Sequence, residues 1–322
     1  MIWDDGYRFV YRPPLAPPFI RPLVFSRTGR RFTLAAQFTE RKPVMQITPI
    51  SGALGAEIAG VDLARELSNS DAAAVHEAFL AHRVLFFRDQ KLSPAEFVRF
   101  AHLFGEPDIY PFIKGLPEAP EVIDIIKTET DTKNFGGSWH SDTSYMECPA
   151  LATTLYALEV PEAGGDTLYA NTAMAYDALS SGMKELLLGL VGVNSSEKGY
   201  QGGRAAGMAR LDAMKGTFQA EARTYESEHP VIRTHPETGH KSIYVNRSHT
   251  VRFKDMTVEE SAPLISYLCE HMIQPEFTCR FQWKPGSLAV WDNRTTLHHA
   301  VNDYAGKRRH MRRITIKGDR PC

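Results

Sequence analysis

The stretch Trp139-His140-Ser141-Asp142 decides how the rest of this chain is interpreted. Residues i and i+2 of a β-strand project from the same face, so this spacing predicts that the imidazole of His140 and the carboxylate of Asp142 converge on one point. A neutral imidazole nitrogen and an anionic oxygen together suit Fe(II), and a second, distant histidine would complete the ligand set. Taken alone, His-x-Asp is a weak signal, because a surface histidine beside a turn aspartate gives the same pattern.

The C-terminal region contains residues that could complete such a site. A predicted strand over residues 287–291 leads to His298, and Arg309 and Arg313 follow. If the two arginines share a strand they point to the same face, where two guanidinium groups could bind two different acidic ligands. The alternative interpretation of residues 307–313 is a solvated basic cluster.

Short β-forming runs are spread along the chain, and helical patterns lie mostly in its first part. The predicted strands are residues 84–87, 151–158, 241–245, 277–283, 287–291 and 312–317. The predicted helices are one capped by Ser70 and ending near His82, one opened by a capping box at Ser93 and closed by Gly105, and two over residues 179–190 and 262–272. This pattern predicts a mainly β fold with helical decoration around a β-sandwich or jelly-roll core.

Composition excludes several classes of protein. The 322 residues include 37 Lys+Arg and 38 Asp+Glu, so a protein that coats nucleic acid is not expected. The longest apolar run, residues 186–193, is too short to cross a membrane. Four scattered cysteines without a CxxC pair favour a reducing, cytoplasmic compartment. Nothing in the sequence fixes the oligomeric state, and a homo-oligomer is compatible with it.

Residues 1–44 differ from the rest of the chain. Prolines at positions 13, 14, 17, 18 and 22 interrupt any periodicity, and arginines outnumber the acidic residues. An Arg-rich, acid-poor leader is typical of organelle targeting, although the prolines fit an amphipathic helix poorly. We therefore predict an N-terminal extension of uncertain status over residues 1–44, followed by one domain over residues 45–322.

From about Met45 to its end, the chain resembles the taurine / 2,4-dichlorophenoxyacetate dioxygenase family, whose members depend on Fe(II) and 2-oxoglutarate. Six ordered blocks carry the resemblance. They are residues 139–142, Gly164-Gly165-Asp166-Thr167, residues 229–239, residues 245–250, Trp291-Asp292-Asn293-Arg294 with His298, and Arg308-Arg309 leading to residues 313–316. Together these blocks are far more specific than any one motif.

The resemblance implies a role for each matching residue. His140, Asp142 and His298 would be the iron ligands, and Thr167 and Arg309 would bind the distal carboxylate of 2-oxoglutarate. Arg313 takes the position of an arginine that contacts the substrate sulfonate in taurine enzymes. Because the two arginines are close in sequence, an exchange of their roles remains open. The implied fold is a double-stranded β-helix of the jelly-roll type.

The resemblance also implies a reaction. A small-molecule substrate would be hydroxylated with O2 while 2-oxoglutarate, chelated to iron through its 1-carboxylate and keto oxygen, is converted to succinate and CO2. Related halogenases lack the carboxylate ligand, so the presence of Asp142 favours hydroxylation. If the hydroxylated carbon carries a heteroatom leaving group, the product can break down to an aldehyde.

The substrate is expected to differ from taurine. In taurine enzymes a histidine after the Phe-Gly-Glu corner contacts the substrate, and Tyr110 stands at that position here. A tyrosine can donate a hydrogen bond but carries no positive charge. We therefore expect a small anionic substrate (a sulfonate, a sulfate ester or a carboxylate) bound by Arg313 and Tyr110.

Two other classes of function use some of the same residues. A non-catalytic jelly-roll binding protein would keep the fold, but it has no need of both a complete ligand set and a 2-oxoglutarate subsite. A Zn-dependent hydrolase could use the two histidines and the aspartate. Hydrolysis requires no arginine for 2-oxoglutarate, so Arg309 argues against it.

Overall fold

Eight strands form the largest sheet of the structure, a computed structural model that describes residues 44–198, 217–218 and 224–322. Seven of them follow the order β1 (Gln46–Pro49), β2 (Ala56–Ala59), β3 (Val84–Phe87), β14 (Leu288–Asp292), β6 (Ala152–Glu159), β16 (Arg309–Ile316) and β4 (Pro107–Asp108), and β5 (Ile123–Lys127) also pairs with β16. The pairs are antiparallel except β2 with β3. Every residue of β3 and β14 is buried, which explains the apolar sequence of β3 and of the first four residues of β14.

A second, three-stranded sheet packs against the first. It has the order β13 (Thr278–Phe281), β7 (Thr167–Asn171), β15 (Thr296–Ala300). Aromatic side chains fill the space between the sheets. Phe86 stacks on Phe281 with a ring-centroid distance of 3.9 Å and meets Tyr169 edge to face at 5.7 Å. This packing gives the mainly β core that the sequence predicts.

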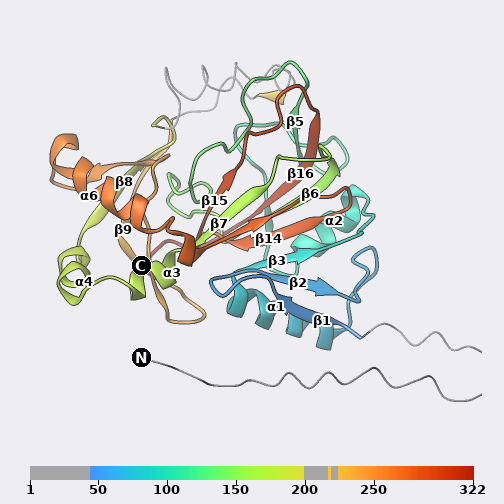
Figure 1. Ribbon diagram of the computed structural model, residues 1–322, viewed down its shortest axis with the longest axis horizontal. Coiled ribbons are helices and arrows are strands. Elements are labelled where there is room, and N and C mark those ends of the chain that lie inside the picture. Colours follow the sequence, from blue (N-terminus) through green and yellow to red (C-terminus); the bar gives the residue numbers. More distant parts are fainter. Residues whose placement is uncertain (1–43, 199–216, 219–223) are drawn as a thin grey trace, which may run out of the picture. The chain divides into compact units, whose positions relative to one another are not determined.

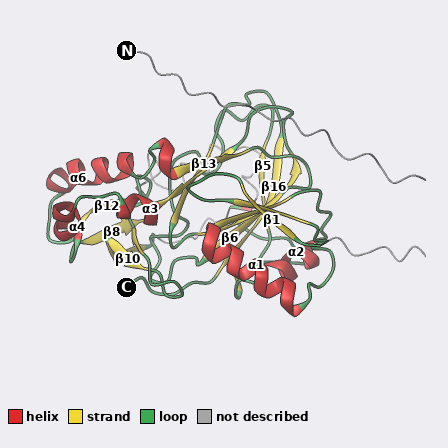
Figure 2. Cartoon of the chain, turned by 60° about the horizontal axis from the view of Figure 1, so that its bottom comes forward, coloured by secondary structure: helices red, strands yellow, loops and turns green. Residues whose placement is uncertain are grey.

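The helices form two groups (Figure 1). One group covers the outer face of the large sheet, and the other lies at the opposite end of the domain. The helices are α1 (Asn69–His82), α2 (Pro94–Ala101), α3 (Thr172–Asp177), α4 (Ser181–Leu187) and α6 (Val258–His271), with a short 3-10 helix η2 (Pro275–Phe277). Phe79 of α1 and Phe97 and Phe100 of α2 pack on β3, β14 and β16. Figure 2 shows these two helices at one end and α3, α4 and α6 at the other.

The remaining strands lie beside α4 and α6. They form a three-stranded sheet in the order β12 (Thr250–Phe253), β8 (Val191–Ser195), β9 (Glu226–Pro230), and a pair, β10 (Ile232–Thr234) with β11 (Lys241–Ile243). Among the residues that the structure describes, no helix is long and apolar enough to cross a membrane. The extension predicted over residues 1–44 lies outside the described residues, apart from Val44.

The helix ends show which of the predicted capping signals mark the true start or end of a helix. The capping box predicted at Ser93 is confirmed, since its Oγ accepts from the backbone N–H of Glu96 and the Glu96 carboxylate accepts from the Ser93 N–H. The cap predicted at Ser70 is wrong, because Ser68 caps α1 by accepting from the N–H of Asp71. The predicted closure at Gly105 is also wrong, as α2 ends at Ala101.

The helix predicted over residues 179–190 is wrong in length. Ser180 caps α4, and this helix covers only Ser181–Leu187. The side chain of Ser180 accepts from the N–H of Met183, which starts the helix after the predicted N-terminus. At the other end, Leu188 has an extended backbone and the chain turns into β8.

Candidate metal centre

His140 and His298 lie side by side because their backbones pair across one isolated bridge. The N–H of His140 donates to the carbonyl of His298 at 3.1 Å, and the reverse bond is 2.9 Å. Their ring centroids are 4.2 Å apart. The strand expected around His140 is wrong in extent, since the chain turns at Thr143 with φ 49°. The predicted convergence of the His140 and Asp142 side chains is nevertheless present.

The third member of the cluster is the carboxylate of Asp142. Its Oδ1 lies 3.7 Å from Nε2 of His140 and 3.9 Å from Nε2 of His298, and one ligand atom from each residue lies within 4.8 Å of the others. Nδ1 of His140 is 2.7 Å from the carbonyl oxygen of Ser138, so when Nδ1 carries the proton Nε2 presents a lone pair to the cluster. These three side chains could hold Fe(II).

The carboxylate of Asp142 is positioned by a hydrogen bond from Thr153, which the sequence did not single out, and through it by Asn293, which lies in one of the matched blocks. Thr153 on β6 donates to Oδ2 at 2.7 Å, and Asn293 donates to the Thr153 hydroxyl at 3.0 Å. The side-chain Oδ1 of Asn293 accepts from the backbone N–H of Asp142 at 3.2 Å and from the indole of Trp291 at 3.0 Å. With Oδ2 occupied, Oδ1 faces the imidazoles.

The ionisation states of this cluster suit a metal. Burial by itself would raise the pKa of Asp142, but the charge of Arg313, the neighbouring imidazoles and the Thr153 hydrogen bond hold it well below its usual range. The pKa of His298 lies well below its ordinary value because burial disfavours the charged ring, and His140 adds to this effect. An ionised carboxylate beside a neutral imidazole is the form in which both bind metal.

Arg309 and Arg313 both lie on β16 and both line the cavity of the cluster, as their spacing predicts. They are only 6% and 3% exposed, so the alternative of a solvated basic cluster is wrong for this pair. Nη2 of Arg313 is 2.7 Å from Oδ1 of Asp142, and its guanidinium carbon lies 5.1 Å from the ring centroid of Tyr110. Arg313 therefore lies at the metal end of the cavity.

Arg309 lies at the other end, near Thr167. Its Nε and Nη2 are buried and have no hydrogen-bond partner among the described residues. The indole of Trp283, which sequence reasoning missed, donates to the Thr167 hydroxyl at 2.9 Å. A buried guanidinium with unpaired N–H groups is costly unless a ligand pairs with it. These groups fit the distal carboxylate of 2-oxoglutarate.

The cavity brings together six of the seven predicted site residues. Its lining comprises His140, Asp142, Thr167, His298, Arg309 and Arg313, together with Ile125, Phe135, Gly136, Leu155, Trp291 and Ala300. The seventh residue, Tyr110, lies behind Arg313 rather than in the lining. It is buried, and its hydroxyl is 3.5 Å from that of Tyr145. Tyr110 therefore contacts the site through Arg313.

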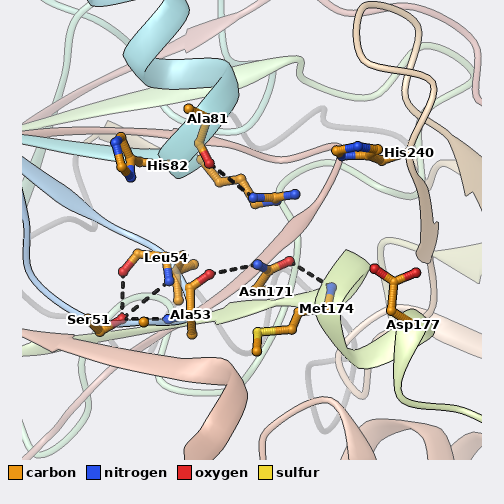
Figure 3. Close-up of a pocket in the computed structure, with 11 residues that line it drawn as sticks. Ser51, Ala53, Leu54, Ala81, His82, Asn171, Met174, Asp177 and His240 are labelled. Carbon is orange, nitrogen blue, oxygen red and sulfur yellow. Dashed lines mark hydrogen bonds between the residues drawn. The ribbon is translucent and has the colours of Figure 1, made fainter.

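A second pocket, of about 300 Å³, contains none of the predicted site residues (Figure 3). It lies between the loop after β1, the end of α1 and the start of α3. Asn171 spans it by donating to the carbonyl of Ala53 at 2.7 Å and accepting from the N–H of Met174 at 3.0 Å. Ser51 likewise donates to the carbonyl of Leu54. These groups bind the protein's own backbone, so we place the chemistry in the other cavity.

Comparison with known proteins points to one family. Residues 46–315 match the family described as Taurine catabolism dioxygenase TauD, TfdA family. An alkylsulfatase of Acinetobacter baylyi is 38% identical over 277 residues, which cover 85% of this chain and 86% of that protein. An alpha-ketoglutarate-dependent sulfate ester dioxygenase of Pseudomonas putida is 34% identical over 280 residues, covering 86% and 91%.

A solved structure shows the same fold. The crystal structure of a taurine dioxygenase from Burkholderia xenovorans superposes with a TM-score of 0.72 at 35% sequence identity, covering 87% of this chain and 93% of that one. Such dioxygenases have a jelly-roll core. The jelly-roll prediction is therefore confirmed.

Proposed function

Because the chain belongs to the TauD/TfdA family, and is thus an Fe(II)- and 2-oxoglutarate-dependent dioxygenase, we propose that His140, Asp142 and His298 hold the iron and that the substrate is an organic sulfate ester. One observation carries this proposal. A compact group of two imidazoles and a carboxylate shares its cavity with two buried arginines, each of which has N–H groups without a hydrogen-bond partner among the described residues.

The two ends of the cavity bind different ligands. When bound, Fe(II) with 2-oxoglutarate and O2 supplies the oxidation that yields succinate, CO2 and a hydroxylated substrate carbon. Arg309 and the Thr167 hydroxyl bind the distal carboxylate of 2-oxoglutarate and so orient it toward the metal end. Arg313 binds the anionic group of the substrate, since its Nη1 has no hydrogen-bond partner among the described residues.

One observation favours a sulfate ester among the anionic substrates. The relatives at 38% and 34% identity carry names of sulfate ester enzymes. Tyr110 lies behind Arg313, so we assign it to positioning that guanidinium, 5.1 Å from its ring centroid, for the anionic group. Hydroxylation of the carbon attached to the ester oxygen gives a hemiacetal sulfate, which breaks its C–O bond to release an aldehyde, sulfate and one proton.

The other expected properties follow from this assignment. We assign the activity to residues 45–322, with residues 1–44 as an extension, because the family match begins at residue 46. The partners are the organic substrate, 2-oxoglutarate and O2. A reducing, cytoplasmic location is supported by the cysteines, which are all free in the described residues.

Turnover of a defined panel tests the proposal. The iron-loaded protein is given 2-oxoglutarate, O2 and, in separate reactions, linear alkyl sulfates, taurine and other sulfonates, and aryloxyacetates. We expect succinate and sulfate to form in equal amounts from an alkyl sulfate, and only with O2 present. Coupled succinate release from a sulfonate or an aryloxyacetate alone would reassign the substrate. If no compound of the panel gives coupled succinate release, the proposed function is overturned.

A further inference from the structure

The buried indole of Trp283 contacts Thr167 and Arg309, two residues that line the cavity. Trp283 follows β13, in which Phe281 pairs with Thr167 of β7, so the sheet register brings the indole N–H to the Thr167 hydroxyl. Trp283 is 6% exposed and Thr167 is 2% exposed. This bond is therefore shielded from water.

The bond determines what the Thr167 hydroxyl can do. An indole N–H is only a donor, whereas a hydroxyl has one proton to donate and two lone pairs to accept. Thr167 must therefore accept from Trp283. Its own proton is left to donate, and its possible acceptors are the nearby Tyr169 hydroxyl and a group bound in the cavity.

The same indole also borders Arg309. The guanidinium carbon of Arg309 lies 5.9 Å from the ring centroid of Trp283, within the range of a cation–π contact. Trp283 thus contacts both side chains that are assigned to the distal carboxylate.

We propose that Trp283 is a positioning residue for 2-oxoglutarate: its N–H orients the Thr167 hydroxyl to donate to the distal carboxylate, and its ring confines the Arg309 guanidinium. This inference rests on the proposed function. Trp283 also packs edge to face on Phe281 at 4.9 Å, so a core role has to be separated from the positioning role. Trp283→Phe keeps an aromatic ring and removes the N–H.

A double-mutant cycle makes this separation. The Kd of 2-oxoglutarate is measured without O2, from the visible band of the Fe(II) complex, for wild type, Trp283→Phe, Thr167→Val and the double variant. Loss of a hydrogen bond to a charged group predicts a Kd about 10-fold or more weaker for Thr167→Val and about 3-fold to 10-fold weaker for Trp283→Phe. If Trp283 acts through Thr167, the double variant is no weaker than Thr167→Val.

A matched ligand provides the control. 2-Oxopentanoate has a methyl group in place of the distal carboxylate, so its Kd should be the same in wild type and Trp283→Phe. Three results would overturn the inference. Trp283→Phe could weaken the binding of both ligands equally, it could leave the Kd of 2-oxoglutarate unchanged, or its effect could add to that of Thr167→Val in the cycle. If thermal unfolding shows that Trp283→Phe is not folded, Trp283→Tyr replaces it with the same expectations. A wild-type protein without any band contradicts the proposed function instead.

Discussion

Two groups of buried charges lie on either side of Asn293, and they differ in how completely they are paired. On one side, Asp292 accepts from Nε and Nη2 of Arg294, both at 2.8 Å, and from Nε2 of His235 at 2.9 Å. The third nitrogen of Arg294 donates to Glu237 at 2.6 Å. On the other side, in the cavity, the arginines have buried nitrogen atoms without a partner among the described residues.

The difference separates charges that stabilise the fold from charges kept for ligands. A buried network stabilises a protein only when every member is satisfied, and an unpaired buried charge costs free energy. The paired group around Asp292 anchors the turn between β14 and β15 and so fixes where His298 emerges. In the cavity, Arg313 is paired with Asp142, whereas the unpaired N–H groups of Arg309 are compensated when an anionic ligand binds. Four predictions test this contrast.

The largest effect is expected for a metal ligand. His298→Ala removes one of the two imidazoles, so succinate formation should fall to the background level. Because His298 is neutral and has an unpaired Nδ1 among the described residues, the fold should tolerate the change. Succinate is measured by chromatography and folding by thermal unfolding. Retained turnover in a folded variant would exclude His298 as a ligand.

The next largest effect is expected on the free energy of unfolding, and it distinguishes the buried arginines Arg294 and Arg309. Arg294→Met leaves Asp292 without its main partner and should lower the free energy of unfolding by about 3–5 kcal/mol. Arg309→Met removes a guanidinium that has unpaired nitrogens, so it should leave stability unchanged or increase it. Urea unfolding measures both variants without ligands. An equal loss in the two would remove the distinction between a structural group and a ligand-binding group.

A smaller effect separates the two arginines of the cavity. Arg309→Met should weaken the Kd of 2-oxoglutarate about 100-fold, with little change in binding of the organic anion. Arg313→Ala should raise the substrate KM strongly and leave 2-oxoglutarate binding nearly intact. Anaerobic titration and initial rates measure the two quantities. The opposite pattern would show that the arginines exchange roles, and loss of both affinities in both variants would defeat separate roles.

The smallest effect concerns pH. Burial alone would raise the pKa of Asp292, but hydrogen bonds from His235 and Arg294 hold it well below its usual range. The stabilisation is therefore complete above the unfolded-state pKa of about 4, and it is lost as the pH falls further toward the folded-state value. Urea unfolding between pH 6 and pH 3 should show this decline. Asp292→Asn, although less stable throughout, should show a smaller one, and identical slopes would contradict the assignment.

The sequence predicted those parts of the site that depend on local spacing. Both arginines share a face because they are four positions apart in one strand. The i, i+2 spacing of His140 and Asp142 predicts their convergence correctly, although the chain turns there instead of continuing as a strand. The supporting residues could not be found in this way. Thr153 and Asn293 are 140 positions apart, and Thr167 and Trp283 are 116 apart, so only the packing of the two sheets brings each pair together. Asn293 at least lies in a recognised block, whereas Thr153 has no local signal.

The most direct measurement is an anaerobic titration of the wild-type protein with Fe(II) and 2-oxoglutarate. The account predicts a visible charge-transfer band that saturates at one equivalent of iron and is absent from His140→Ala. No band in wild type, or an undiminished band after His140→Ala, would contradict the assignment of the iron to His140, Asp142 and His298.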